Sequence, residues 1–125
     1  MDANAARHIL VVEDDESYRR LIARMLENAG FRVTGAADFA AAMAVLDGAE
    51  EIDLLLSDIG MPPGTPHGFS IGSVAQRRRQ ALKLVYMTGD YDPTEFALFS
   101  EDATVLRKPF SAAELVKAIE KALLA

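Results

Sequence analysis

Four short runs of apolar residues, each followed directly by polar side chains, constrain the fold of this chain more than any other feature. They are Ile9 to Val12, Ile52 to Leu56, Leu84 to Met87, and Val105 with Leu106. Each run reads as a buried strand, and between the runs apolar residues recur at the three- and four-residue spacing of helices that bury one face. Strands that alternate with helices in this way predict one parallel sheet with helices on both of its faces.

Five strands and five helices are expected, which together make a doubly wound, five-stranded parallel sheet. The remaining strand is Phe31 to Thr34, where apolar and polar residues alternate. The first helix follows Asp15 and ends at Gly30, a residue that readily adopts the left-handed conformation of a helix C-terminus. The other helices are expected from Asp38 to Gly48, from about Phe69 to Gln80, from Thr94 to Ser100, and after Ser111, where Ser111 and Glu114 form a capping box.

The polar clusters that follow the apolar runs are expected to share one edge of the sheet. They are Glu13-Asp14-Asp15, Asp58, Thr88 and Lys108-Pro109. In an open α/β sheet, ligands bind beyond the carboxyl ends of the strands. The carboxylates, the hydroxyl and the ammonium group of these clusters suit a divalent cation and a phosphoryl group at that edge. The chemistry that we infer is phosphoryl transfer to Asp58.

Composition and charge narrow the class of protein. The chain has 125 residues, enough for one domain with a sizeable core, and we expect a flexible N-terminus over residues 1–7 and the domain over residues 8–125. It contains no cysteine, which excludes disulfides and thiolate metal sites. The net charge is −6 and the only basic run is Arg77-Arg78-Arg79, so nucleic-acid binding is disfavoured. The apolar run before Glu13 is too short for a signal peptide or a membrane span, and we expect a cytoplasmic protein.

Four motifs resemble the signature of one family, the receiver domains of two-component response regulators. They are Val11 to Asp15, Asp58 to Pro62, Met87-Thr88-Gly89, and Arg107 to Phe110, and they occur in order over nearly the whole chain. The resemblance implies the flavodoxin-like fold of receivers. It also implies a stand-alone receiver that signals through protein contact or relays phosphate. The expected phosphoryl donor is a sensor histidine kinase or a histidine phosphotransfer protein, and the downstream target is an unknown protein. No turnover of an external substrate is expected.

The resemblance also implies roles for single residues. Asp58 matches the carboxylate that accepts phosphate from a phosphohistidine, and an ionised oxygen needs no base to activate it. Asp14 and Asp15 match the acidic pair that holds Mg²⁺ together with Asp58 and the main-chain carbonyl of Gly60. Lys108 matches the lysine that pairs with a phosphoryl oxygen, and Thr88 matches the hydroxyl that bonds to the phosphoryl group.

Two further expectations concern the surroundings of these residues. In the family, the peptide bond before the residue that matches Pro109 is cis and directs the lysine into the site. Gly60 and Asp90 lie two residues after the acceptor and the threonine, so they flank the path of an attacking water and are expected to tune dephosphorylation.

The chain departs from the common receiver pattern at Val105. That position usually holds an aromatic residue whose rotation is coupled to the threonine, and a branched aliphatic side chain cannot replace it. The run Tyr86 to Tyr91 resembles a receiver subgroup with a Phe-Ala-Thr-Gly-x-Tyr run that also lacks the aromatic residue. Our hypothesis is that phosphorylation instead orders the segment from Thr88 to Ser100.

Three other classes of protein are alternatives to a receiver domain. An FMN-binding flavodoxin would need a phosphate-binding loop after the first strand, where Glu13-Asp14-Asp15 would repel phosphate. A phosphatase of the haloacid-dehalogenase type would need an aspartate at the position of Gly60. The third class is a pseudo-receiver, an interaction module that works without phosphorylation, and Val105 is the feature that favours it.

Overall fold

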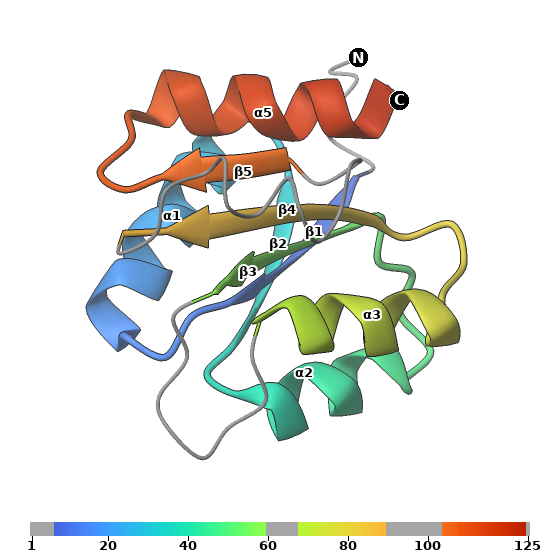
Figure 1. Ribbon diagram of the computed structural model, residues 1–125. Helices are drawn as coiled ribbons and strands as arrows, with labels where there is room; N and C mark the ends of the chain where they lie inside the picture. The colour runs from blue at the N-terminus through green and yellow to red at the C-terminus, as the bar shows by residue number, and fades with distance from the viewer. Residues whose placement is uncertain (1–6, 60–67, 90–103, 125) are drawn as a thin grey trace.

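A computed structural model describes residues 7–59, 68–89 and 104–124 of the chain (Figure 1). One parallel sheet has the strand order β2-β1-β3-β4-β5. In chain order the elements are β1 (His8–Val12), α1 (Glu16–Asn28), β2 (Arg32–Ala36), α2 (Phe39–Leu46), β3 (Leu54–Asp58), α3 (Gly68–Arg78), β4 (Lys83–Thr88), β5 (Thr104–Arg107) and α5 (Ala112–Leu124). The doubly wound, five-stranded parallel fold predicted from the sequence is therefore confirmed.

The helix count differs from the expectation only where the chain is not described. Within the described ranges the structure has four helices, and the helix predicted from Thr94 to Ser100 lies outside them. The predicted strands are present with shifted ends. β3 starts two residues later than the apolar run and extends to Asp58, since parallel pairing with β4 continues as far as the contact of Asp58 with Met87. Asp58 is therefore part of the strand and does not lie in the loop after it.

The sheet carries a hydrophobic core on each face, which explains why its central strands are apolar without interruption. Ile9 and Val11 of β1 pack in the core under α1 and α5, while Leu10 and Val12 pack in the core under α2 and α3. In Figure 1 the two helix pairs lie on opposite sides of the sheet. A strand that is buried on both faces needs apolar residues at every position, in contrast to the alternating pattern of a one-sided sheet.

Helix α1 begins and ends where local side-chain chemistry requires. The Oδ1 atom of Asp15 accepts a hydrogen bond of 3.0 Å from the main-chain N–H of Tyr18, which satisfies one of the free amide groups of the first turn. After the helix, Gly30 has a φ angle of 98°, a conformation that is strained for any other residue type. Ile22 and Leu26 form the buried stripe of the helix.

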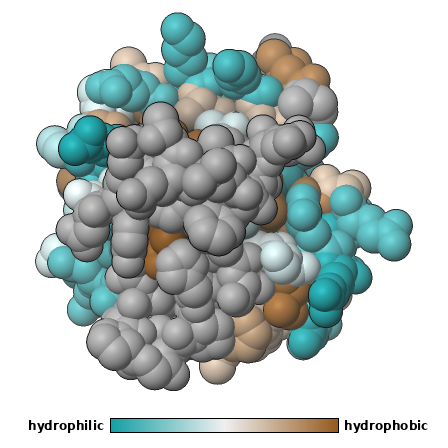
Figure 2. All heavy atoms as spheres, viewed as in Figure 1, coloured by the Kyte–Doolittle hydropathy of each residue, from teal (hydrophilic) through white to brown (hydrophobic). Residues whose placement is uncertain are grey.

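Helix α5 begins with the predicted capping box. The main-chain N–H of Glu114 donates to Ser111 Oγ at 3.1 Å, and the main-chain N–H of Ser111 donates to Glu114 Oε1 at 3.3 Å. Leu115, Ile119 and Ala122 are the buried face of this helix. Teal spheres are prominent along the top of Figure 2, where this helix lies, in agreement with the exposure of Glu114, Lys117, Glu120 and Lys121. None of the described helices is long and apolar enough to cross a membrane.

Candidate functional site

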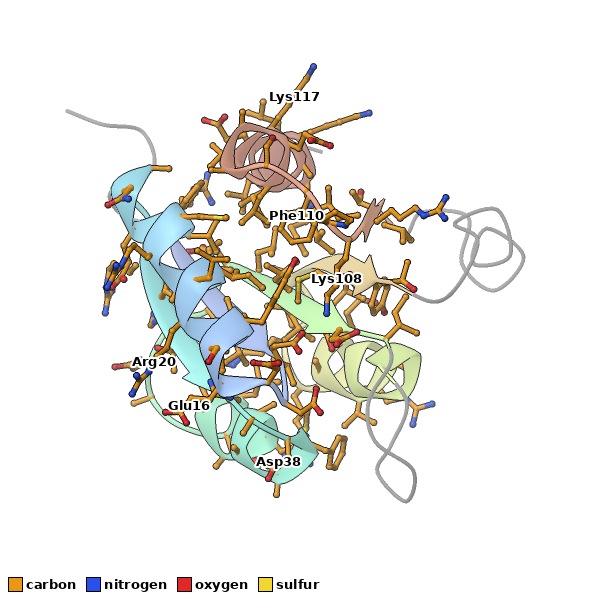
Figure 3. The ribbon with its side chains drawn as sticks, turned by 90° about the vertical axis from the view of Figure 1, so that its left-hand side faces the viewer. Glu16, Arg20, Asp38, Lys108, Phe110 and Lys117 are labelled. Carbon is orange, nitrogen blue, oxygen red and sulfur yellow. The ribbon has the colours of Figure 1, made fainter. Side chains whose placement is uncertain are left out.

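The carboxyl ends of four strands bring the predicted polar residues to one edge of the sheet. Glu13 and Asp14 directly follow β1, Asp58 ends β3, Thr88 ends β4, and Lys108 directly follows β5. The parallel register places Asp58 opposite Met87, next to Thr88, and Thr88 opposite Arg107, next to Lys108. Figure 3 shows the side chain of Lys108 extending from the end of β5 toward this edge.

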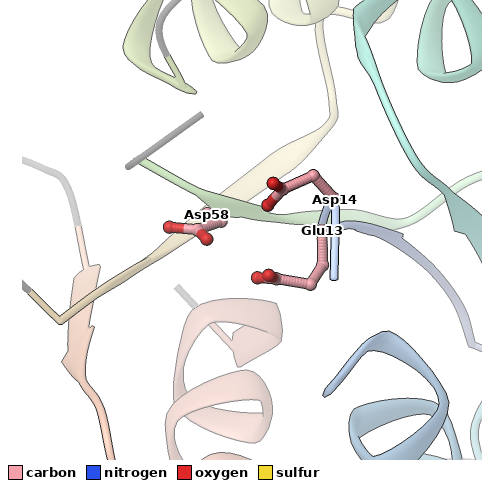
Figure 4. Close-up of side chains that lie close together, drawn as sticks. All are labelled: Glu13, Asp14 and Asp58. Carbon is pink, nitrogen blue, oxygen red and sulfur yellow. The ribbon is translucent and has the colours of Figure 1, made fainter. Parts of the chain in front are cut away.

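Three carboxylates converge at the centre of the site. One oxygen of each of Glu13, Asp14 and Asp58 lies within 4.8 Å of the other two (Figure 4). Glu13 is 2% exposed and Asp58 is 6% exposed, whereas Asp14 is open to solvent. Carboxylate oxygens are the ligands of hard divalent cations such as Mg²⁺ and Ca²⁺, and an exposed member leaves an entry path for a cation that keeps some of its water. These residues therefore fit a divalent cation.

Among the described residues, the ammonium group of Lys108 forms ion pairs with two of these carboxylates. Its Nζ atom lies 3.0 Å from Asp58 Oδ2 and 3.1 Å from Glu13 Oε2. The main chain holds the residue in register, because the N–H of Lys108 donates to the carbonyl of Thr88 at 2.7 Å. The peptide bond between Lys108 and Pro109 is cis, the conformation that the family resemblance implies.

Burial and charge shift the proton affinity of two groups in the site. Burial, followed by the neighbouring Asp58 carboxylate, raises the pKa of Glu13 to about 7, although Lys108 opposes the shift. Burial alone would lower the pKa of Lys108, but its hydrogen bonds and charge interactions with Asp58 and Glu13 outweigh this effect and raise the pKa. Lys108 therefore remains a cation at neutral pH.

Asp15 is the predicted metal-ligating residue that the structure does not bring to Asp58. Its side chain caps helix α1, is exposed, and is not a member of the carboxylate group that the described residues form. The third member of that carboxylate group is Glu13. The sequence held a signal for this arrangement, because a residue directly before a helical stripe is the natural N-cap, and Asp is among the best N-cap residues. Assigning Asp15 to the cap would have left Glu13 and Asp14 for the site.

The remaining predicted residues divide into those that the structure describes and those that it does not. Thr88 is 1% exposed at the end of β4. Val105 is partly buried, and it lies opposite Tyr86 in the register of β4 and β5 and packs in the same small cluster. Gly60 and Asp90 lie outside the described residues, as does most of the segment from Thr88 to Ser100. Their expected roles stay predictions.

Comparison with known proteins decides the family. A family model described as the response regulator receiver domain matches residues 9–120. The chain belongs to the receiver domain family. Among relatives, the response regulator receiver protein CpdR of Brucella abortus is 37% identical over 123 residues, covering 95% of this chain and 98% of CpdR. The transcriptional regulatory protein PdtaR of Mycobacterium tuberculosis is 30% identical, covering 97% of this chain but 58% of PdtaR.

A solved structure supports the same assignment for the fold of this receiver domain. The crystal structure of a response regulator receiver protein from Sinorhizobium medicae superposes with a TM-score of 0.85 at 30% sequence identity, and the match covers 96% of each chain. The chain is therefore a receiver domain of the two-component response regulators in both sequence and fold. Receiver domains generally bind Mg²⁺ at an acidic pocket, and in this chain the group of the buried Glu13 and Asp58 and the exposed Asp14 is suited to hold a metal.

Proposed function

We propose that this receiver domain accepts a phosphoryl group from a phosphohistidine onto Asp58 in a reaction that requires Mg²⁺. The observation that carries the proposal is the environment of the Asp58 carboxylate. It is buried at the end of a strand, lies in a group of three carboxylates, and is paired at 3.0 Å with Lys108. An aspartate that served only the fold would not need two further carboxylates beside it, because like charges at this distance repel each other.

In the proposed reaction, a carboxylate oxygen of Asp58 attacks the phosphorus atom of the phosphohistidine. The new bond is a P–O bond, and the P–N bond to the imidazole breaks with its electron pair leaving on nitrogen. Lys108, a compact cation already held beside Asp58 Oδ2, pairs with the phosphoryl oxygens that carry negative charge in the transition state. Hydrolysis of the resulting acyl phosphate reverses the modification.

Glu13, Asp14 and Asp58 are the residues proposed to hold Mg²⁺, directly or through water, and Asp15 is left out of this set. When bound, the cation neutralises carboxylate charge that would otherwise repel the incoming phosphoryl group. The chain contributes a fixed carboxylate group at the end of β1 and β3 and one lysine that balances part of its charge. The main-chain carbonyl of Gly60 stays a predicted fourth ligand.

Thr88 is proposed to bond to the phosphoryl group through its hydroxyl and so to link phosphorylation to the segment that follows β4. The proposed partners are a sensor histidine kinase or a histidine phosphotransfer protein as phosphate donor, and a downstream protein that reads the phosphorylated form. The cytoplasmic location and the division into residues 1–7 and 8–125 stay predictions from the sequence.

The test is incubation with acetyl phosphate, with and without Mg²⁺, followed by intact-mass measurement. The wild type is expected to gain one phosphoryl group only when Mg²⁺ is present, and Asp58→Asn is expected to gain none. Asp38→Asn is the matched control, because it makes the same chemical change at a helix cap where asparagine serves equally well. The control should be phosphorylated like the wild type.

The opposite results would contradict the proposal. An adduct on Asp58→Asn at the wild-type level would move the acceptor to another residue. No adduct on the wild type with acetyl phosphate or with a phosphorylated histidine phosphotransfer protein would favour the pseudo-receiver function, for which the aliphatic Val105 beside Tyr86 is the supporting observation.

A further inference from the structure

Tyr18, in the first turn of α1, lies against the lysine of the site. Lys108 Nζ lies over the tyrosine ring at 4.5 Å from its centroid. Neither the acidic cluster nor the family motifs include Tyr18, and its position four residues before Ile22 only places it in line with the buried stripe of α1. Among the residues that the structure describes, the ammonium group thus lies beside the carboxylates of Asp58 and Glu13 and over one aromatic face.

Two contacts hold the tyrosine ring in this place. The main-chain N–H of Tyr18 is bound by the Asp15 cap, which orients the first turn of α1. The ring of Phe110 meets the ring of Tyr18 nearly at right angles, with an angle of 88° and centroids 6.1 Å apart. Phe110 is itself 9% exposed and belongs to the core under α1 and α5, so the ring is supported from the protein interior.

The face of an aromatic ring attracts a cation, and it restricts the directions in which that cation can move. A lysine side chain has a flexible stem of four carbons. If its ammonium group contacts carboxylates alone, it can move with those carboxylates or rotate into solvent. In the structure the ring of Tyr18 occupies one side of the Lys108 ammonium group, whose Nζ atom lies 3.0 Å from Asp58 Oδ2.

We propose that Tyr18 is a positioning residue that holds Lys108 toward Asp58 by a cation–π contact, so that the ammonium group is in place when the phosphoryl group arrives. This inference rests on the proposed phosphorylation of Asp58 and adds a residue from α1 to the machinery. The competing explanation is that Tyr18 only fills space at the edge of the core, against which it packs.

The experiment compares phosphorylation rates with acetyl phosphate and Mg²⁺ for the wild type, Tyr18→Phe and Tyr18→Leu. Phenylalanine keeps the aromatic face and loses only the hydroxyl, so the wild-type rate is expected. Leucine has no aromatic ring to contact the Lys108 ammonium group. The rate constant at saturating acetyl phosphate is therefore expected to fall roughly three- to tenfold, the range that a partly exposed cation–π contact supports.

Phe39→Leu is the matched control. Phe39 is a partly buried aromatic residue that packs against the other core, under α2 and α3, so its loss changes packing but not the site. It should lower the melting temperature and leave the rate unchanged. If Tyr18→Leu melts within the assay range, Tyr18→Met replaces it, since methionine keeps a long apolar side chain without an aromatic face.

A second readout does not depend on phosphorylation. Protons on the end of the Lys108 side chain lie over an aromatic face, so their NMR signals are expected at higher field than those of other lysines. This shift should persist in Tyr18→Phe and disappear in Tyr18→Leu. Its absence in the wild type would overturn the inference, as would equal rates for Leu and wild type, or an equal loss in Phe and Leu. Failure of the proposed function looks different, because the wild type itself would then take no phosphate.

Discussion

Glu13 is the carboxylate whose pKa is raised most above its ordinary value among the residues that the structure describes. Its raised pKa of about 7 means that the folded chain without a divalent cation keeps a proton that the unfolded chain loses near the ordinary pKa of 4.5. The unfolded chain therefore binds fewer protons between these two values. Stability is expected to fall as the pH rises through this window, the opposite of a carboxylate in a simple salt bridge.

The same proton competes with a divalent cation for Glu13. Mg²⁺ affinity is expected to rise with pH by up to about tenfold per unit below pH 7 and to level off above it. Glu13→Gln should weaken binding and remove this pH dependence, which calorimetric titration of Mg²⁺ at about pH 6 and about pH 8 will measure. Glu16→Gln, a change at an exposed position of α1, is the control and should behave like the wild type. A wild-type affinity that does not change with pH would contradict this assignment.

Asp14 and Asp15 are adjacent in sequence but are expected to respond differently to mutation. Asp14→Asn should lower Mg²⁺ affinity by about tenfold or more with little change in stability, because it removes one exposed oxygen ligand from the carboxylate group. Asp15→Ala should cost about 1 kcal/mol of unfolding free energy by removing the cap of α1. Urea unfolding and Mg²⁺ titration of both variants separate the two effects. Equal losses of Mg²⁺ affinity in the two variants would return Asp15 to the metal site.

At the scale of elements, the contact between α3 and β4 depends on the absence of a side chain at Gly72. A Cβ atom there would lie 3.0 Å from Tyr86 Cζ and still closer to its hydroxyl oxygen. Tyr86 is 4% exposed, so its ring has little room to move. Tyr86 itself packs with Ile59 and Val105, so the close approach at Gly72 brings α3 against a ring of that small cluster.

Gly72→Ala is therefore expected to destabilise the fold by roughly 1 to 3 kcal/mol, although alanine is the better helix former. In the double variant with Tyr86→Phe, removal of the hydroxyl oxygen should recover a measurable part of this loss. Urea unfolding of the four proteins of this double-mutant cycle gives the coupling free energy. A coupling near zero would show that the tyrosine hydroxyl is not the obstacle.

The whole molecule is a sheet between two helix layers, and this architecture has a direct energetic signature. Leu55 and Leu56 are neighbours in β3, and both are 0% exposed, but they lie in different cores. Leu55→Ala and Leu56→Ala are each expected to cost about 2 to 5 kcal/mol in urea unfolding. In a sheet covered on one face only, one of these two substitutions would lie on the exposed face and would change the unfolding free energy little. Leu21→Ala, at a position that is 48% exposed, is the control and should stay within about 0.5 kcal/mol of the wild type.

The fold followed closely from the sequence because its signals are local and repeated. The uninterrupted apolar runs around Val11 and Leu55 require burial on both faces, and the capping box at Ser111 and Glu114 marks a helix start without reference to the rest of the chain. The strand ends shifted by one or two residues, because ends depend on pairing with a neighbouring strand. The continuation of β3 to Asp58 is such a case.

The sequence by itself determined the sheet edge at which the acidic residues, Asp58, Thr88 and Lys108 gather, because parallel strands expose their carboxyl ends on one side. Only the tertiary structure decided which acidic residues face Asp58. Three consecutive acidic residues follow the first strand, and the sequence does not say which of them caps the helix and which lie beside Asp58. The tertiary structure alone brought Tyr18 to Lys108, 90 positions along the chain. Contacts between side chains on separate elements depend on packing in three dimensions, which no spacing along the chain records.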